Sequence, residues 1–232
     1  MLMRNNDEIS KHYSISSNKY KYFDIPEGIH KKIISWTGEG KAVLDIGCAN
    51  GYLGQELKKN RNILCGIEIS ETAAKEARKY YDNIIVGNIE SMEMPYKSEQ
   101  FDVIICADIL EHLFNPEKIL KRLNKYLKAS GSIIVSIPNI AHWSIRLKLL
   151  LGRFEYEETG LLDCGHIRFF TYDSARKMFN RAGYNIERED SVISLPKGFN
   201  KFAYIFKLNW LFKMVGRSFW GYQFIFFLKK DG

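Results

Sequence analysis

The sequence has few cysteines and few prolines, four and five among 232 residues. Cys48, Cys65, Cys106 and Cys164 are scattered, and no two of them form a C-x-x-C pair. Disulfide frameworks and cysteine-based zinc sites need closely patterned cysteines, so this scatter predicts a reduced, cytoplasmic chain without either. Residues 1–8 also lack the apolar core of a signal peptide.

Long apolar runs and long basic runs are missing as well. No uninterrupted apolar stretch has the length that spans a bilayer. The net charge of +7 comes from 34 Lys and Arg against 27 Asp and Glu, and we interpret it as a solvated surface, with an acidic partner such as nucleic acid as the alternative. With 46% hydrophobic residues, the chain is predicted to form one domain over residues 1–232, as a monomer or a homodimer.

What the sequence does contain is a glycine turn between a short apolar run and a helical pattern. Gly47 and Gly51 frame the turn, and Asp45 precedes it by two residues. Counted from Gly47, the second and third positions of the dinucleotide fingerprint G-x-G-x-x-G hold Ala49 and Tyr52, so the fingerprint fails at two of three places. The Lys-Ser/Thr pair of a P-loop is also absent. The turn therefore favours a ligand that has a positive charge and no phosphate.

Strand-length apolar runs alternate with helical patterns along most of the chain. This rhythm predicts an α/β fold with a doubly wound, mostly parallel sheet. The predicted strands are 42–46, 62–69, 83–86, 101–106, 132–137, 184–193 and 223–228, and the predicted helices include 70–81, 115–129 and 171–182.

Polar residues follow the second and third predicted strands. Glu68 lies 23 positions after Asp45 (68 − 45) and ends the second strand, where a carboxylate can accept hydrogen bonds from both hydroxyls of a ribose. The alternative is that Glu68 caps the helix that starts near Ser70. After the third strand, the side chain of Asn88 can both accept from and donate to an adenine ring, although Gly-Asn alone is more often a plain turn.

The segment Asp45-Ile46-Gly47-Cys48-Ala49-Asn50-Gly51 resembles the first motif of class I S-adenosylmethionine-dependent methyltransferases, hydrophobic-Asp-hydrophobic-Gly-Cys-Gly-x-Gly, with Ala49 in place of the middle glycine. The resemblance implies a Rossmann-like seven-strand sheet of order 3-2-1-4-5-7-6, with the last strand antiparallel. It also implies S-adenosylmethionine as cofactor. The implied cofactor-binding residues are Asp45, Gly47, Cys48, Ala49, Gly51, Glu68, Ile69, Asn88, Ile89 and Ala107, with Tyr22 as a candidate lid residue.

Three segments depart from the strand-helix rhythm. Residues 1–36 are predicted to form an N-terminal cap, and residues 139–170 an acceptor-binding lid that contains an amphipathic helix within 142–154. The lid resembles a bacterial methyltransferase subgroup linked to glycosyltransferases, and also methionine-biosynthesis and ubiquinone-type O-methyltransferases. Residues 196–221 are rich in aromatic and basic residues, and we interpret them as a helical insertion packed on the sheet or on a second subunit. A membrane surface or an apolar acceptor is the alternative.

Methyl transfer from a sulfonium is an in-line displacement, so most of the catalysis can come from holding two bound partners in position. A hydroxyl acceptor benefits from a base, and histidine suits neutral pH. His166 and His142, in the predicted lid, are ranked ahead of His112. No metal site is predicted, because no third and fourth ligand stand near Asp163 and His166 in the sequence.

The main hypothesis is an S-adenosylmethionine-dependent methyltransferase that acts on a small molecule at oxygen, with a sugar-linked or lipid-linked acceptor. A catalytically silent cofactor-binding partner is the first alternative, suggested by Ala49 and Asn88. A nucleic-acid methyltransferase is the second. The chain lacks the Asn/Asp-Pro-Pro-Tyr/Phe motif of amino-group methylation, which weakens this last reading.

Overall fold

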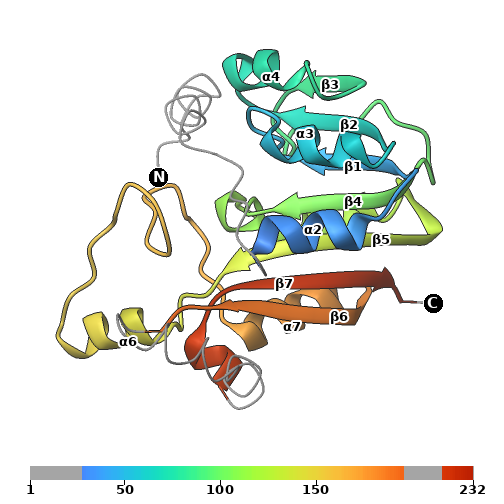
Figure 1. Cartoon of the computed structure of the whole chain (residues 1–232). Coiled ribbons are helices and arrows are strands. Elements are labelled where there is room, and N and C mark those ends of the chain that lie inside the picture. Colours follow the sequence, from blue (N-terminus) through green and yellow to red (C-terminus); the bar gives the residue numbers. More distant parts are fainter. Residues whose placement is uncertain (1–27, 196–215, 232) are drawn as a thin grey trace.

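The computed structural model describes residues 28–195 and 216–231. In this part of the chain seven strands form one sheet of order β3-β2-β1-β4-β5-β7-β6, as predicted (Figure 1). The strands are β1 Ala42–Ile46, β2 Ile63–Glu68, β3 Asn83–Val86, β4 Phe101–Ala107, β5 Leu127–Pro138, β6 Tyr184–Ile193 and β7 Gly221–Lys230. β1 runs parallel to β2 and β4, whereas β7 is antiparallel to both β5 and β6.

Helices cover both faces of the sheet, because successive side chains of each central strand point to opposite faces. In β1, Val43 packs with the helices of one face and Leu44 with those of the other. The helices are α2 Ile29–Thr37, α3 Tyr52–Lys59, α4 Glu71–Ala77, α5 Pro116–Leu123, α6 Trp143–Leu150 and α7 Tyr172–Arg181, with a short 3-10 turn η1 at Leu110–His112. Buried residues of α2, α3 and α4 pack on the Val43 side, and those of α5 and α7 on the Leu44 side.

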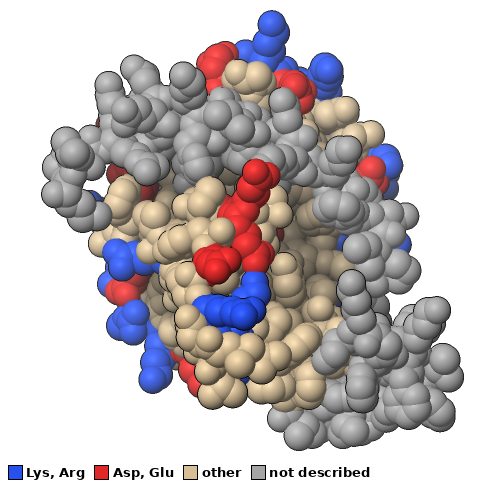
Figure 2. Space-filling view, turned by 90° about the vertical axis from the view of Figure 1, so that its left-hand side faces the viewer, with Lys and Arg blue, Asp and Glu red and all other residues tan. Residues whose placement is uncertain are grey.

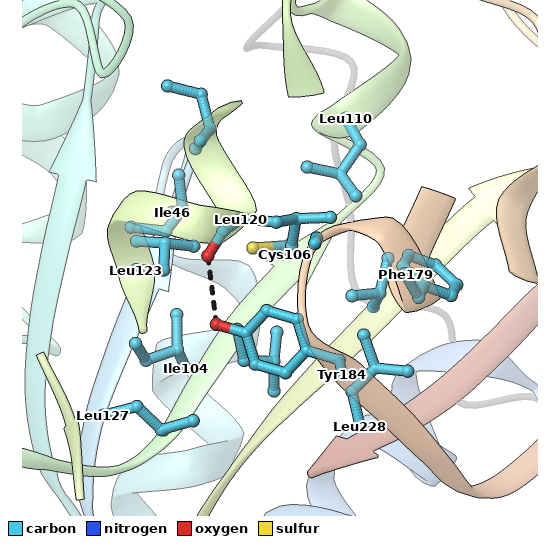
Figure 3. Packing of buried hydrophobic residues seen from close by; sticks show 14 of the residues in the cluster. Ile46, Ile104, Cys106, Leu110, Leu120, Leu123, Leu127, Phe179, Tyr184 and Leu228 are labelled. Atoms are coloured by element: carbon cyan, nitrogen blue, oxygen red, sulfur yellow. Dashed lines mark hydrogen bonds between the residues drawn. The ribbon is translucent and has the colours of Figure 1, made fainter. Parts of the chain in front are cut away.

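On the Leu44 side of the sheet, a buried tyrosine of β6 is hydrogen-bonded to α5. Tyr184, fully buried at the start of β6, donates a hydrogen bond of 3.0 Å to the carbonyl oxygen of Leu120 in α5 (Figure 3). Phe179 of α7 and Leu228 of β7 pack in the same cluster. The buried hydroxyl thereby has the hydrogen-bond partner without which its burial would be costly. The same bond links α5 to β6.

Three predicted helices differ from the structure. The helix predicted over 70–81 ends at Ala77, and residues 78–80 form a turn. The helix predicted over 115–129 ends at Leu123, and β5 begins at Leu127. Leu123, Tyr126 and Leu127 are all buried in one cluster, so their spacing imitates a helical face although only Leu123 lies in the helix. The helix within 142–154 is α6, and it is not amphipathic. Of its residues only Ile145 is buried, while Leu147, Leu149 and Leu150 are exposed.

The carboxyl ends of β1, β2, β4 and β5 meet at one edge of the sheet, which is where ligands bind in open α/β folds. Among the described residues, no helix combines the length and the apolar character needed to cross a membrane.

Candidate functional site

The glycine turn at residues 47–51 joins β1 to α3 at this edge. Gly47 and Gly51 have φ of +75° and +84°, in the left-handed region that glycine adopts without strain. A Cβ on Gly51 would lie 2.8 Å from the Cα of Ala77, so only glycine lets the start of α3 approach the end of α4 this closely. Ala49 also has a positive φ, +47°, at the position where the methyltransferase motif has its middle glycine.

Glu68 lies at the end of β2, where it was predicted, and its carboxylate is turned toward the glycine turn. Its Oε2 accepts a hydrogen bond from the Ala49 amide, and its Oε1 one from the Ser70 amide, both at 2.9 Å. Burial raises the pKa of Glu68, and these amide hydrogen bonds oppose that shift. The Ile69 amide is a third backbone group close to this carboxylate. A carboxylate offers about four acceptor positions, so capacity for a ligand hydroxyl remains. The side chain that caps α4 is Ser70, not Glu68: its Oγ accepts from the Ala73 amide.

Asp45 is buried in β1 and accepts a 2.5 Å hydrogen bond from the hydroxyl of Tyr81, a residue just beyond α4. Burial raises the pKa of Asp45 to about 7, and the Tyr81 hydrogen bond opposes the shift. Asp45 thus links β1 to Tyr81, which is buried in the same cluster as Cys48 of the turn. Its contact with the cofactor stays a prediction.

Because the native pKa of Asp45 is above its usual value of 3.8, the native protein holds a proton that the unfolded chain has released between about pH 4 and pH 7. The free energy of unfolding therefore falls as pH rises through this interval. Asp45→Asn cannot ionise, and we expect it to flatten this fall and to unfold at a higher urea concentration than the wild type at pH 8.

Urea unfolding of both proteins at pH 5, 6, 7 and 8 measures the difference. Asp82→Asn is the matched control, since Lys58 lowers the pKa of the exposed Asp82 and its ionisation favours the folded state. Parallel curves for the wild type and Asp45→Asn would show that Asp45 does not titrate in this range.

The residues predicted to flank adenine lie at and after the end of β3. The Oδ1 of Asn88 accepts a 2.9 Å hydrogen bond from the Glu90 amide within its own turn, which leaves the side-chain amide nitrogen as the group able to donate to a ring. Ile89 is buried in the core, as are Cys48 and Ala107, while Ile69 is half-buried. Tyr22 and residues 196–215 lie outside the described residues, so the lid role of Tyr22 stays a prediction.

Asp108 follows β4 and was not singled out by the sequence. It has a positive φ of +50°, and its Oδ1 accepts a 2.9 Å hydrogen bond from the Ser136 hydroxyl. The side-chain amide of Gln223 donates to both of its oxygens at 2.6 Å. Asp108 thus connects the ends of β4, β5 and β7. Its place directly after the fourth strand, at the ligand-binding edge, was the one signal that pointed to it.

Two of the three candidate histidines come together beside Asp108. The rings of His112 and His166 have centroids 4.9 Å apart. His112 Nδ1 donates to the Gly165 carbonyl at 2.9 Å, and His166 Nδ1 to the Leu161 carbonyl at 3.3 Å. His166 is buried, and this burial lowers its pKa, so it is neutral near pH 7.

His142 lies apart from that pair. Its Nδ1 is 2.8 Å from the Ser144 hydroxyl, and its Nε2 is 3.0 Å from the Ser194 carbonyl oxygen. The ring stands edge-on to Tyr222, with centroids 5.5 Å apart. To act as a base, His142 would have to give up one of these hydrogen bonds.

A buried acid accompanies the pair. Glu111 is 1% exposed, and its Oε1 lies 4.0 Å from His166 Nε2. Burial and the negative charge of Asp108 raise the pKa of Glu111 well above its usual value. The backbone carbonyl of Glu111 accepts hydrogen bonds from the amides of Ile167 and Arg168, which fixes the returning end of the 139–170 insertion onto the turn after β4.

The described residues on the side of α6 and the 139–170 insertion form a surface with little charge. Figure 2 views the molecule from the side of α6 and the 139–170 insertion, and most of the described surface there is neither acidic nor basic. One acidic group and one basic group adjoin each other near its centre. The described part of this face is therefore not a cationic surface.

The geometry fits a nucleoside with a cationic tail. A buried carboxylate and a tight main-chain turn stand side by side, and Glu68 has no ion pair with Lys or Arg among the described residues. A phosphate would be repelled by Glu68, whereas ribose hydroxyls can donate to it.

Comparison with known proteins agrees with this geometry. Residues 20–189 match a methyltransferase domain. Over 109 residues the chain is 32% identical to the ubiquinone biosynthesis O-methyltransferase of Glaesserella parasuis, a match that covers 43% of this chain and 46% of that protein. The protein of the same name from Acinetobacter baylyi is 29% identical over 106 residues, covering 43% and 44% of the two chains. The matches thus span a little under half the length of these curated relatives.

Solved structures share the whole fold at lower identity. A SAM-dependent methyltransferase from Archaeoglobus fulgidus has a TM-score of 0.62 and 16% identity, over 94% of this chain and 99% of that one. One from Aquifex aeolicus has a TM-score of 0.58 and 17% identity, over 97% and 98%. At these identities the likeness is one of fold.

Proposed function

Because this chain belongs to the methyltransferase domain family, whose members use S-adenosylmethionine, we propose that it transfers a methyl group to an oxygen atom of a small-molecule acceptor. The observation that carries the proposal is the hydrogen bond from Ala49 in the glycine turn to Glu68. It places an acidic strand end against the turn that, by resemblance, holds the cofactor. When bound, the cofactor supplies an electrophilic methyl group on a sulfonium.

The protein's own residues would position the two reactants. We assign the ribose hydroxyls to Glu68 and the amino acid end to the main chain of residues 47–51. The acceptor would enter beside the end of β4, between His112, His166 and the 139–170 insertion, which we assign as its lid. Holding the acceptor oxygen in line with the methyl carbon and the sulfur can supply most of the rate enhancement in such a reaction.

His112 and His166 are the histidines we favour near the acceptor, because the structure brings them together at the strand ends. A neutral imidazole there can take the proton that a hydroxyl loses as it becomes a methyl ether. His142 ranks behind them, since both of its ring nitrogens lie within hydrogen-bond distance of Ser144 or Ser194.

A small acceptor is favoured over nucleic acid by the described surface on the side of α6 and the 139–170 insertion, most of which is neither acidic nor basic (Figure 2). Nucleic-acid binding depends on many Lys and Arg contacts to phosphates. The names of the curated relatives, with ubiquinone biosynthesis in them, support an acceptor hydroxyl. A sugar-linked or lipid-linked acceptor, a cytoplasmic location and the oligomeric state stay predictions.

Incubation with methyl-labelled S-adenosylmethionine and a panel of phenols, sugar hydroxyls and amines tests the proposal. We expect label in a hydroxyl product and S-adenosylhomocysteine in equal amount, with little label in the amines. Label in amines alone would refute oxygen as the acceptor atom. Tight cofactor binding without methyl transfer to phenols, sugar hydroxyls or amines would favour the alternative of a catalytically silent cofactor-binding partner.

A further inference from the structure

We propose that Glu111, His112 and His166 form a binding site for a divalent transition-metal ion at the carboxyl end of β4. Each residue offers one ligand atom, and these atoms all lie within 4.8 Å of one another. One carboxylate with two imidazoles is a ligand set used by zinc and by related ions such as cobalt and iron. The site goes beyond the proposed function, because it requires neither the cofactor nor the acceptor to be bound. The two roles belong to different states of the protein: a histidine whose Nε2 lone pair binds an ion cannot also accept a proton from the acceptor.

The carboxyl group of Glu111 is the first observation that points to a cation. It is 1% exposed, and neither of its oxygens has a hydrogen-bond partner. A buried carboxyl group is costly unless it is hydrogen-bonded, paired with a charge or bound to a metal. Its Oε1 lies 4.0 Å from His166 Nε2, too far for a hydrogen bond and close enough for both atoms to share an ion.

The orientation of the two histidines is the second observation. Their Nδ1 atoms face the carbonyl oxygens of Gly165 and Leu161, so we assign the ring protons to Nδ1 and the lone pairs to Nε2. Metal-binding histidines are commonly held in this way, with one ring N–H on a backbone carbonyl and the other nitrogen on the metal. Both carbonyls belong to the 139–170 insertion, which therefore orients both rings.

The spacing permits an ion after a small contraction. Metal-ligand bonds of about 2.1 Å put ligand atoms roughly 3.4 Å apart in a tetrahedral site, so each side chain must move by less than about 1 Å. Two further acids, Asp108 and Asp163, add negative charge near Glu111, which favours a cation there. Three protein ligands are fewer than a closed structural site uses, which leaves at least one coordination position open.

Titration of the full chain without an affinity tag, after treatment with a chelator, tests the site. Co²⁺ is added and its visible absorption is followed, and Zn²⁺ is then added in competition. We expect one equivalent of Co²⁺ to bind with the absorption of a site of low coordination number, and Zn²⁺ to displace it. Glu111→Gln, His112→Gln and His166→Gln should each weaken Co²⁺ binding at least tenfold.

Two variants serve as controls. Cys164→Ser removes an exposed thiol two residues from His166, and His142→Gln removes a buried histidine outside the cluster; neither should change the affinity. Circular dichroism without metal shows whether each variant is folded, and Glu111→Gln should be folded because it keeps the volume of the acid. No Co²⁺ binding by the wild type, or equal binding by all three folded cluster variants, would overturn the proposal. Cofactor binding, measured separately, reports on the methyltransferase assignment.

Discussion

Glu68→Ala is expected to weaken the binding of S-adenosylhomocysteine by about 100-fold or more. The wild-type carboxylate holds the amides of Ala49 and Ser70 and retains acceptor positions that we assign to the two ribose hydroxyls. Hydrogen bonds to a charged acceptor contribute about 1.5–3 kcal/mol each, so losing two costs roughly 3–6 kcal/mol. A 100-fold loss corresponds to about 2.7 kcal/mol, just below that range, because the neighbouring main chain relaxes and recovers part of the loss.

Isothermal calorimetry with the cofactor product measures this loss. The affinity of Glu68→Gln should lie between those of the wild type and Glu68→Ala, because glutamine retains one acceptor oxygen and loses the charge. Glu71→Ala is the matched control, since it removes an exposed acid three residues away in the first turn of α4. If Glu68→Ala binds as tightly as the wild type, the ribose does not lie on this carboxylate and the cofactor position proposed above is wrong.

Gly54→Ala should lower the free energy of unfolding by about 2 kcal/mol, although alanine is the better helix former. In the interior of α3, replacing glycine by alanine would ordinarily add about 1 kcal/mol of stability. Here a Cβ would lie 2.1 Å from Cε2 of Tyr81. The ring is buried and hydrogen-bonded to Asp45, so it cannot move aside freely, and such overpacking costs about 1–3 kcal/mol or more.

Urea unfolding of four proteins separates the clash from the helix propensity: wild type, Gly54→Ala, Tyr81→Leu and the double variant. Leucine lacks the outer ring atoms that the new methyl group meets. If the clash is the cause, the double variant loses less stability than the sum of the two single variants. Additive losses, or a Gly54→Ala variant more stable than the wild type, would exclude the clash.

The strands of the sheet could be predicted because each is encoded by a short apolar run and by the residues directly beside it. The runs at 42–46, 83–86 and 184–193 coincide with β1, β3 and β6, since each is bounded by residues that end a strand. The position of Glu68 at the end of β2 follows from the same pattern. The strand order came from the resemblance, because apolar runs by themselves do not say which strands are neighbours.

The partners of the buried polar groups could not be predicted from the sequence. Asp45 meets Tyr81 from 36 residues away, and Asp108 meets Gln223 from 115. The sequence argument against a metal considered only ligands near His166. It did not consider Glu111 and His112, which lie more than 50 residues earlier in the chain and come close to His166 because the 139–170 insertion folds back onto η1. That insertion has no regular hydrophobic period from which its path could be read.

The position of β7 has a consequence for the order in which the molecule can be completed. A ribosome makes β5 and β6 before β7, yet each of them has β7 as its neighbour in the finished sheet. Until the last of the seven strands emerges, β5 and β6 have open hydrogen-bonding edges, and Asp108 lacks the amide of Gln223. A product stopped before residue 221 would therefore leave backbone N–H and C=O groups of β5 and β6 unpaired, and such open strand edges favour aggregation.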